Sequence, residues 1–164
     1  MKYLIWLFAC SLALSAQAQK PRPRQPATRL STTIPATEPV LVVKRTPCHG
    51  TCPVYTAAIF ADGRVEYEGE RYVSLLGKHT LSLPVATVDQ LLAEAKRINF
   101  PKLQDQYVGN NTDLSATIIT VHPVGQTAKT VHAQENLPDS LENYVNFLAQ
   151  RLDKLANNSL SLDK

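Results

Sequence analysis

The dipeptide Asp62-Gly63 most constrains the fold, because it lies between two runs of residues that favour β-strands. Asp-Gly is one of the strongest short signals for a β-hairpin, since both central positions of a type I′ turn require positive φ. We therefore expect residues 54–61 and 64–73 to pair as antiparallel strands. Acidic residues alternate through the second run and predict one face in water: Glu66, Glu68 and Glu70.

Further β-prone runs predict a larger sheet. Residues 40–44 form a short β-branched run and are the expected first strand, and residues 78–83 are expected to add a strand after the hairpin. A second hairpin is expected where residues 116–122 and 128–132 flank a Gly-Gln turn at 125–126. Together these runs supply about five to six strands.

Two helices are expected, each opened by a capping box, in which the first residue is followed three positions later by Gln or Glu. Apolar side chains then recur at helical spacing over residues 87–99 and 139–155. The residues of the two boxes are Thr87, Gln90, Asp139 and Glu142. A polar loop is expected at residues 102–114. This order predicts an α+β fold, an antiparallel sheet of about five to six strands with both helices packed on one face.

Residues 1–18 have the pattern of a secretory signal peptide. Lys2 precedes an uncharged apolar run that ends at Leu14, and small residues at positions 16 and 18 predict cleavage before Gln19. The segment is too short for a lasting anchor, and no later stretch approaches the roughly 20 apolar residues that span a bilayer. We expect an exported protein, in the periplasm or outside the cell, without a transmembrane anchor after processing.

An alternative interpretation makes Cys10 a lipidated cysteine. The sequence Leu7-Phe8-Ala9-Cys10 has the length of a lipoprotein box. Phe8 is bulky where such a box has a small residue, and the apolar run continues past Cys10. We therefore do not expect a lipid anchor at Cys10.

The rest of the chain divides into three segments by composition. Residues 19–39 contain five prolines among basic and hydroxyl side chains and predict a Pro-rich basic linker. Residues 40–156 hold the strand and helix patterns and are expected to form a single α+β domain. Residues 157–164 are expected to form a flexible C-terminal tail.

The distribution of charge argues against nucleic-acid binding. Of 17 lysines and arginines and 14 acidic residues, residues 40–164 hold 12 and 13, so the expected domain is close to neutral. A nucleic-acid-binding domain needs a basic excess on its folded surface, and we expect no nucleic-acid partner. The basic linker suits a loose, charge-driven contact with an anionic polymer, so a cell-envelope protein or polymer is the expected partner.

Cys48 and Cys52 remain as an even pair once Cys10 leaves with the signal peptide. In an oxidising compartment a disulfide between them is expected. The bond would close a small loop between the first two strands, and Gly50 would provide the backbone freedom that brings the sulfurs together. Loop entropy for so small a ring is about 2 kcal/mol, so the bond fixes local shape more than it stabilises the domain.

Two functional alternatives stay open for the same loop. A redox pair needs a thiolate of depressed pKa, usually at a helix N-terminus, whereas a strand pattern follows these cysteines. Two thiolates and an imidazole also suit Cu(I), which makes Cys48, Cys52 and His49 candidate metal ligands. The motif Cys-x-x-x-Cys-Pro is similar to that of Sco-type copper chaperones, although nothing else of that thioredoxin-like family is matched. Other histidines that could complete the ligand set are His79, His122 and His132, the last two placed near each other by the second hairpin.

Several of these features together resemble a known family. They are Cys48-His49-Gly50-Thr51-Cys52-Pro53-Val54-Tyr55, Asp62-Gly63, Val65-Glu66-Tyr67-Glu68-Gly69, Gly77-Lys78-His79, Asn99-Phe100, Tyr107 and Thr112-Asp113. This set is similar to a bacterial extracytoplasmic domain of unknown function with the signature Cys-x-Gly-x-Cys-Pro-x-Tyr followed by a β-hairpin. The resemblance covers residues 40–155 and implies an exported or lipid-anchored protein of Gram-negative bacteria without an assigned activity.

The sequence favours a non-enzymatic binding or structural component of the bacterial cell envelope. It contains no Ser/His/Asp order, no paired carboxylates in an apolar setting and no Gly-rich phosphate loop, so we predict no catalytic residue and no cofactor. The alternative is a periplasmic copper-binding or thiol-redox protein that uses Cys48 and Cys52.

Overall fold

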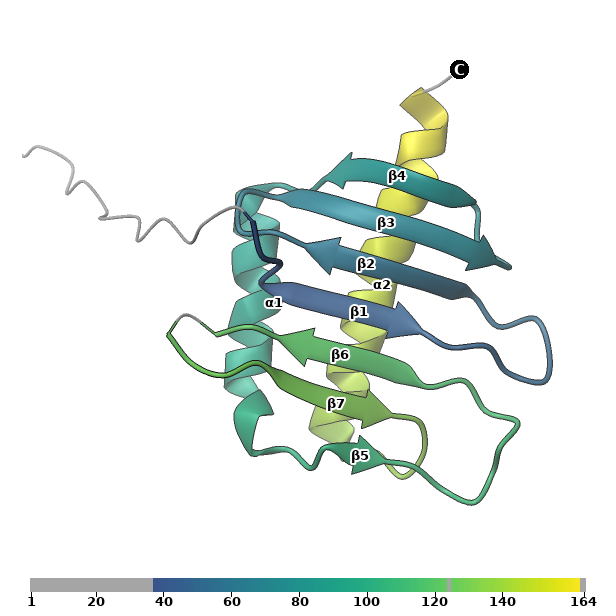
Figure 1. The fold of residues 1–164 in the computed structure, drawn as a ribbon, viewed down its shortest axis with the longest axis vertical. Coiled ribbons are helices and arrows are strands. Elements are labelled where there is room, and N and C mark those ends of the chain that lie inside the picture. The colour runs from purple at the N-terminus through teal and green to yellow at the C-terminus, as the bar shows by residue number, and fades with distance from the viewer. Residues whose placement is uncertain (1–36, 124, 163–164) are drawn as a thin grey trace, which may run out of the picture. The chain divides into compact units, whose positions relative to one another are not determined.

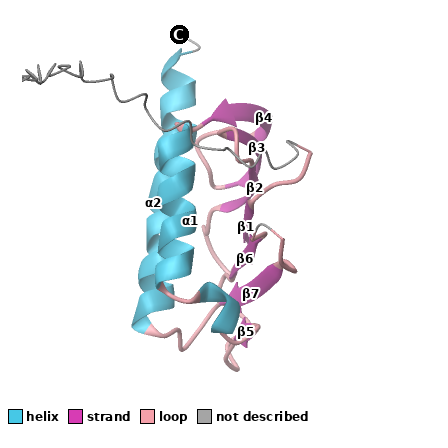
Figure 2. Cartoon of the chain, turned by 90° about the vertical axis from the view of Figure 1, so that its left-hand side faces the viewer, coloured by secondary structure: helices cyan, strands magenta, loops and turns pink. Residues whose placement is uncertain are grey.

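The structure, a computed structural model, describes residues 37–123 and 125–162, without the side chains of residues 160–162. These residues form an α+β fold in which one sheet is covered on one face by two long helices (Figures 1 and 2). The α+β class and the placement of both helices on one face agree with the sequence pattern. The predicted signal peptide and almost all of the predicted linker lie outside the described residues.

The sheet has seven strands in the order β4-β3-β2-β1-β6-β7-β5. The strands are β1 (Leu41–Arg45), β2 (Val54–Ile59), β3 (Arg64–Arg71), β4 (Gly77–Ser82), β5 (Gln106–Tyr107), β6 (Thr117–Val121) and β7 (Lys129–Ala133). β1 lies at the centre because it pairs with β2 on one side and with β6 on the other, both antiparallel.

The prediction of a wholly antiparallel sheet of five to six strands is wrong in strand count and in one direction. β5 lies in the expected polar loop and pairs parallel to β7, which makes the sheet mixed. Its pairing is carried by backbone groups, since the N–H of His132 donates to the carbonyl of Asp105 at 2.8 Å and that of Gln134 to the carbonyl of Tyr107 at 2.9 Å. A two-residue strand has no alternation to detect, so the sequence pattern misses it.

The hairpin around Asp62-Gly63 is confirmed, but its turn differs from the expected type I′. Of the two residues Asp62 and Gly63, only Gly63 has a positive φ, 92°. The turn therefore does not meet the type I′ requirement of positive φ at both central positions. The N–H of Phe60 donates to the carbonyl of Arg64 at 2.9 Å, and the N–H of Gly63 donates to the carbonyl of Phe60 at 3.0 Å. This is a three-residue loop with a glycine bulge, the next most common hairpin connection.

The helices are α1 (Val85–Arg97), the short 3-10 helix η1 (Phe100–Lys102) and α2 (Asp139–Leu162). The capping box at Thr87 is not used: α1 begins two residues earlier, after Pro84, and has no side-chain cap. The carbonyl of Pro84 instead accepts the N–H of Thr87 at 2.8 Å. α2 also follows a proline and continues to Leu162, through residues that the sequence pattern assigned to the tail.

The core lies between the helices and the covered face of the sheet. Alternate strand residues point into it, which confirms the alternation predicted for β3: Val65 and Tyr67 are buried and Glu66 and Glu68 are exposed. The hydroxyl of Tyr144 on α2 donates to the carbonyl of Leu91 on α1 at 3.2 Å and joins the two helices inside the core.

Candidate functional site

The cysteine loop, residues 46–53, connects β1 to β2 at one end of the sheet. Cys48 and Cys52 form a disulfide with Cα atoms 5.8 Å apart, which is within the usual range for such bonds. His49, Gly50 and Thr51 between them are exposed.

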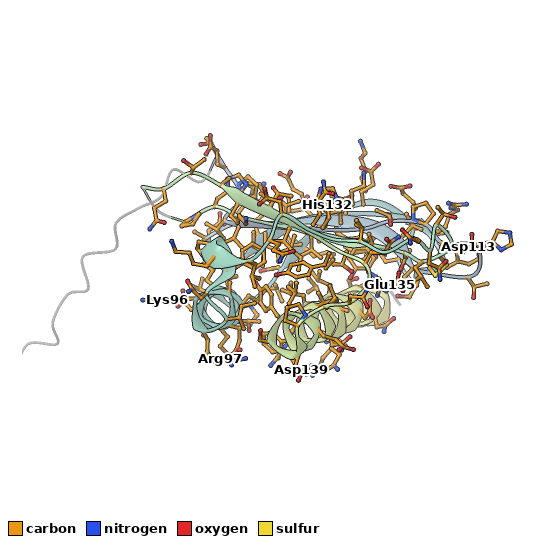
Figure 3. All side chains as sticks on the ribbon, turned by 90° about the horizontal axis from the view of Figure 1, so that it is seen from below. Lys96, Arg97, Asp113, His132, Glu135 and Asp139 are labelled. Atoms are coloured by element: carbon orange, nitrogen blue, oxygen red, sulfur yellow. A yellow bond between two sulfur atoms is a disulfide. The ribbon has the colours of Figure 1, made fainter. Side chains whose placement is uncertain are left out.

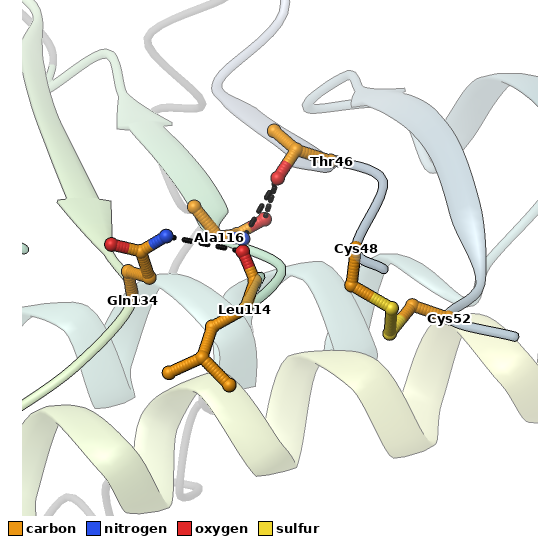
Figure 4. The surroundings of a disulfide bond; sticks show 6 residues. All are labelled: Thr46, Cys48, Cys52, Leu114, Ala116 and Gln134. Carbon is orange, nitrogen blue, oxygen red and sulfur yellow. Dashed lines mark hydrogen bonds between the residues drawn. A yellow bond between two sulfur atoms is a disulfide. The ribbon is translucent and has the colours of Figure 1, made fainter. Parts of the chain in front are cut away.

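Hydrogen bonds also hold the cysteine loop in place (Figure 4). The N–H of Thr46 donates to the carbonyl of Ala116 at 2.9 Å, and the N–H of Ala116 donates to the hydroxyl of Thr46 at 2.8 Å. The N–H of His49 donates to the carbonyl of Asp113 at 3.0 Å. The loop is therefore positioned against the segment before β6 as well as by its own covalent bond.

Gly50 does not have the role expected from the sequence. Positive φ among glycines occurs at Gly63, Gly77 and Gly125 within the described chain, and Gly50 is not among them. A Cβ atom at Gly50 would lie 3.7 Å from Sγ of Cys48, an ordinary contact. The disulfide therefore closes without the special backbone freedom of glycine.

The four histidines are spread over the molecule and do not gather around the cysteines. Within residues 37–123 and 125–162 no group of three or more His, Cys, Asp or Glu side chains could hold a metal ion. His79 contacts the carbonyl of Leu76 at 2.8 Å through Nε2. The expected proximity of His122 and His132 is wrong, because His132 pairs with Ile118, at the other end of β6 from His122. Figure 3 shows His132 on the side of the sheet away from the helices.

A buried polar cluster beneath the cysteine loop was not found from the sequence. Arg45, the last residue of β1, lies opposite Tyr55 in the β1–β2 pairing. Tyr55 is 1% exposed, and neither its hydroxyl nor Nε of Arg45 has a well-formed hydrogen bond to any described residue. The ring of Tyr55 stacks on that of Tyr67 with centroids 5.5 Å apart. Tyr55 is the last residue of the cysteine signature, but the sequence does not indicate its charged neighbour.

The environment of this cluster keeps its tyrosines protonated. Burial raises the pKa of Tyr55 above its ordinary range, the negative charge of Asp153 on α2 adds to the shift, and the Arg45 guanidinium opposes it. Burial and Asp153 also raise the pKa of Tyr67 to about 12. Both hydroxyls therefore stay neutral to a higher pH than that of an exposed tyrosine.

A second unpartnered group lies at the same end of the sheet. Oε2 of Glu135 is buried without a hydrogen-bond partner among the described residues. Its carboxylate occupies the space above Gly109, where a Cβ atom would come within 1.7 Å of Oε2. Glycine is therefore required at position 109 for the observed position of the carboxylate.

A groove with an apolar floor and two basic side chains lies beside β4, and we call it the β4–α2 groove. It has a volume of about 600 Å³ and lies between β4 with its following turn and the C-terminal half of α2. Its apolar lining residues are Leu75, Leu81, Leu83, Pro84 and Leu155. Its other lining residues are His79, Thr80, Ser82, Thr87, Arg151, Lys154, Asn158 and Ser159.

Two glycines on β3 and its preceding turn bring the wall of this groove into place. A Cβ atom at Gly69 would lie 2.0 Å from the carbonyl oxygen of Leu75, so glycine allows the β3–β4 loop to fold back over β3. At Gly63 the corresponding distance is 2.2 Å to the carbonyl oxygen of Leu83. The N–H of Leu83 also donates to the carbonyl of Gly63 at 2.8 Å, which joins the β2–β3 turn to the end of β4.

The charge of the groove is positive, because its lining includes Arg151 and Lys154 and no acidic side chain. The guanidinium of Arg151 lies 5.1 Å from the ring centre of Phe147, one turn earlier on α2. The spacing of Arg151, Lys154 and Leu155 is the available sequence signal, since residues three and four apart share a helix face. This spacing predicts a groove only once β4 is known to lie beside α2.

Comparisons with known proteins assign the chain to a family without a described activity. Residues 39–155 match the family described as a domain of unknown function, DUF6438. No curated protein and no solved structure matches the chain significantly. In the described residues, no helix is both long and apolar enough to cross a membrane.

Proposed function

The chain belongs to the DUF6438 family of domains of unknown function, and from this premise we propose that it is an exported, non-enzymatic binding domain of the bacterial cell envelope. The β4–α2 groove is the observation that supports a binding role. Ligand sites in proteins combine apolar surface with a few polar groups that fix orientation, and this groove has both.

The residues that suggest chemistry in the sequence support a structural role instead. Cys48 and Cys52 are joined to each other, so neither is a thiolate in this state, and a Cu(I) site or a redox nucleophile would first require reduction of the bond. The closed disulfide therefore favours a structural role for the cysteine loop.

Export is supported by the signal-peptide pattern of residues 1–18 and by the cysteine pair, which forms a disulfide in oxidising compartments. Intact-mass measurement of the protein isolated from envelope fractions tests this part of the proposal. The expected mass corresponds to a chain that begins at Gln19 and carries no lipid. A diacylglyceryl adduct on a chain that begins at Cys10 would establish a lipid anchor instead.

Site-specific photo-crosslinking in cells that produce the protein tests the binding role. A photoreactive amino acid in place of Asn158, which is exposed and lines the groove from α2, is expected to give a discrete crosslinked product. The matched control replaces Gln106, an exposed residue on β5 at the opposite edge of the sheet from β4. Identical products from both positions, or none from Asn158, would count against the groove as the binding site.

A further inference from the structure

We infer that the β4–α2 groove binds an extended, acidic segment of a partner protein, which adds to the sheet as a further strand beside β4. This inference rests on the proposed binding function and specifies its ligand. It is carried by three observations: the free edge of β4, the position of α2 beside that edge, and the charge of the groove.

β4 is the last strand on its side of the sheet and pairs only with β3 among the described strands. It is six residues long, and such an edge presents alternate N–H and C=O groups to an incoming strand. The opposite edge strand, β5, has two residues and is too short to act as a template. β4 is therefore the edge that is able to accept a strand of useful length.

α2 forms a second wall along this edge. In Figure 1 the C-terminal part of α2 passes behind β4 and continues beyond it. Successive side chains of an added strand would point alternately toward α2 and away from it. Those that point toward α2 would meet Leu81 and Leu155 on the floor of the groove.

Basic side chains lie on both sides of the place where the added strand would lie. Arg151 and Lys154 project from α2 into the groove. Lys78 lies on β4 directly before His79, and since successive strand residues point to opposite faces, it approaches from the other face of the sheet. Its Nζ is 3.8 Å from a carboxylate oxygen of Glu68, so it is only loosely paired. Acidic side chains of the ligand that point toward α2 therefore meet two cations, whereas on the outer face Lys78 is accompanied by Glu66 and Glu68.

The same charges argue against two other occupants. A second copy of this chain that paired through β4 would bring the same basic surface of both copies together, because such an interface is isologous. The chain's own residues 19–36 carry Lys20, Arg22, Arg24 and Arg29. They also contain four prolines, which have no N–H to donate to an edge strand. Charge thus favours an acidic segment from another protein.

A blocked nonapeptide that alternates Glu with Val and Thr is the probe, with its binding measured by fluorescence anisotropy and by backbone NMR shifts. We expect shifts concentrated in β4 and the C-terminal half of α2, and an affinity that weakens with salt. The variant Arg151→Glu/Lys154→Glu should weaken binding by about tenfold or more, because two attractive charges become repulsive. The control Lys96→Glu/Lys102→Glu makes the same charge change near the end of α1, where Figure 3 shows Lys96 on the outer side, and should bind as the unmodified protein does.

Two modified peptides test the mode of binding. Methylation of alternate peptide nitrogens removes the donors that face β4 and should abolish binding if the peptide adds as a strand. Replacement of every Glu by Lys should also abolish it. Equal binding of the acidic and basic peptides, or unchanged binding to Arg151→Glu/Lys154→Glu, would overturn the inference. A concentration-dependent dimer with the same β4 shifts would identify a second copy as the occupant and overturn it as well.

The crosslinking and peptide experiments distinguish a failure of the proposed binding function from a failure of the proposed ligand. If crosslinks form from position 158 while the peptide probes do not bind, the binding function stands and the ligand chemistry is wrong. If neither is observed, both proposals fail.

Discussion

The cysteine loop and the β4–α2 groove differ in how their parts are held together. The cysteine loop is closed by a covalent bond and by hydrogen bonds from Thr46 and His49 to the segment before β6. The β4–α2 groove is formed where β4 and α2 lie side by side, and the outer edge of β4 has no pairing partner among the described strands. The cysteine loop, which contains the chemically reactive side chains, is therefore the region whose groups already have partners within the chain. The β4–α2 groove, which contains no cysteine, is the region with an unpaired strand edge.

The largest difference in stability between the two regions is expected from glycine substitutions. We expect Gly63→Ala to destabilise the fold by about 3 kcal/mol or more, because a positive φ costs 1–2 kcal/mol without glycine and the new Cβ would meet the backbone of Leu83. Gly50→Ala, in the cysteine loop, should change stability by less than about 1 kcal/mol, since its Cβ has room. Urea unfolding of both variants measures the difference. Equal losses would mean that the cysteine loop is as tightly constrained as the wall of the groove.

Removal of the disulfide should have the next largest effect. Cys48→Ser/Cys52→Ser is expected to lower the free energy of unfolding by about 2 kcal/mol, the loop-entropy value for a small ring. Peptide binding at the β4–α2 groove should be unchanged, because the cysteine loop does not line it. Denaturant unfolding and anisotropy on the same preparation test both statements.

The same variant decides the copper or thiol-redox alternative. The unmodified protein should contain no free thiol before reduction, and its disulfide should resist mild thiol buffers. If the reduced protein instead binds one Cu(I) tightly, loses it in the double-serine variant and binds it more weakly after His49→Ala, the cysteine loop is a metal site. That result would move the protein to the metal-handling class.

A smaller effect is expected for the hydroxyl that joins the two helices. Tyr144→Phe removes the hydrogen bond to the carbonyl of Leu91 and should cost about 1 kcal/mol. Thermal unfolding followed by circular dichroism is sensitive enough to detect it. No loss would show that the carbonyl of Leu91 is satisfied equally well within α1.

The smallest effect at neutral pH is expected for Tyr55→Phe, because the lost hydroxyl has no well-formed hydrogen bond. The variant should differ above pH 10. The pKa of Tyr55 is raised in the folded state, so unfolding releases a proton once the pH exceeds the ordinary tyrosine value of about 10, and stability falls as pH rises. Tyr55→Phe lacks this contribution and should become the more stable protein in alkaline solution. Parallel unfolding curves from pH 7 to 11 would contradict the assigned burial.

The local pattern of residues was sufficient to predict both hairpins, both helices and the side of β3 that faces water. These features depend on neighbours within a few positions, where the periods of strand and helix are directly readable. Even for the helices, the ends differ from the predicted ones. Pro84 rather than Thr87 begins α1, and α2 continues past residue 155 because Ala156 is still buried in the core.

The sequence by itself determined which segments become strands and helices and that two cysteines lie in the loop between the first strands. Only the tertiary structure decided that β1 pairs with β6, joining Leu41 to Val121, that β5 adds in parallel, and that β4 is a free edge beside α2. Those choices depend on long-range packing and pairing, for which local periodicity contains no signal. Arg45 lies opposite Tyr55 because β1 pairs with β2, and the cationic groove exists because β4 lies beside α2. Neither feature is predictable before the strands and helices are placed.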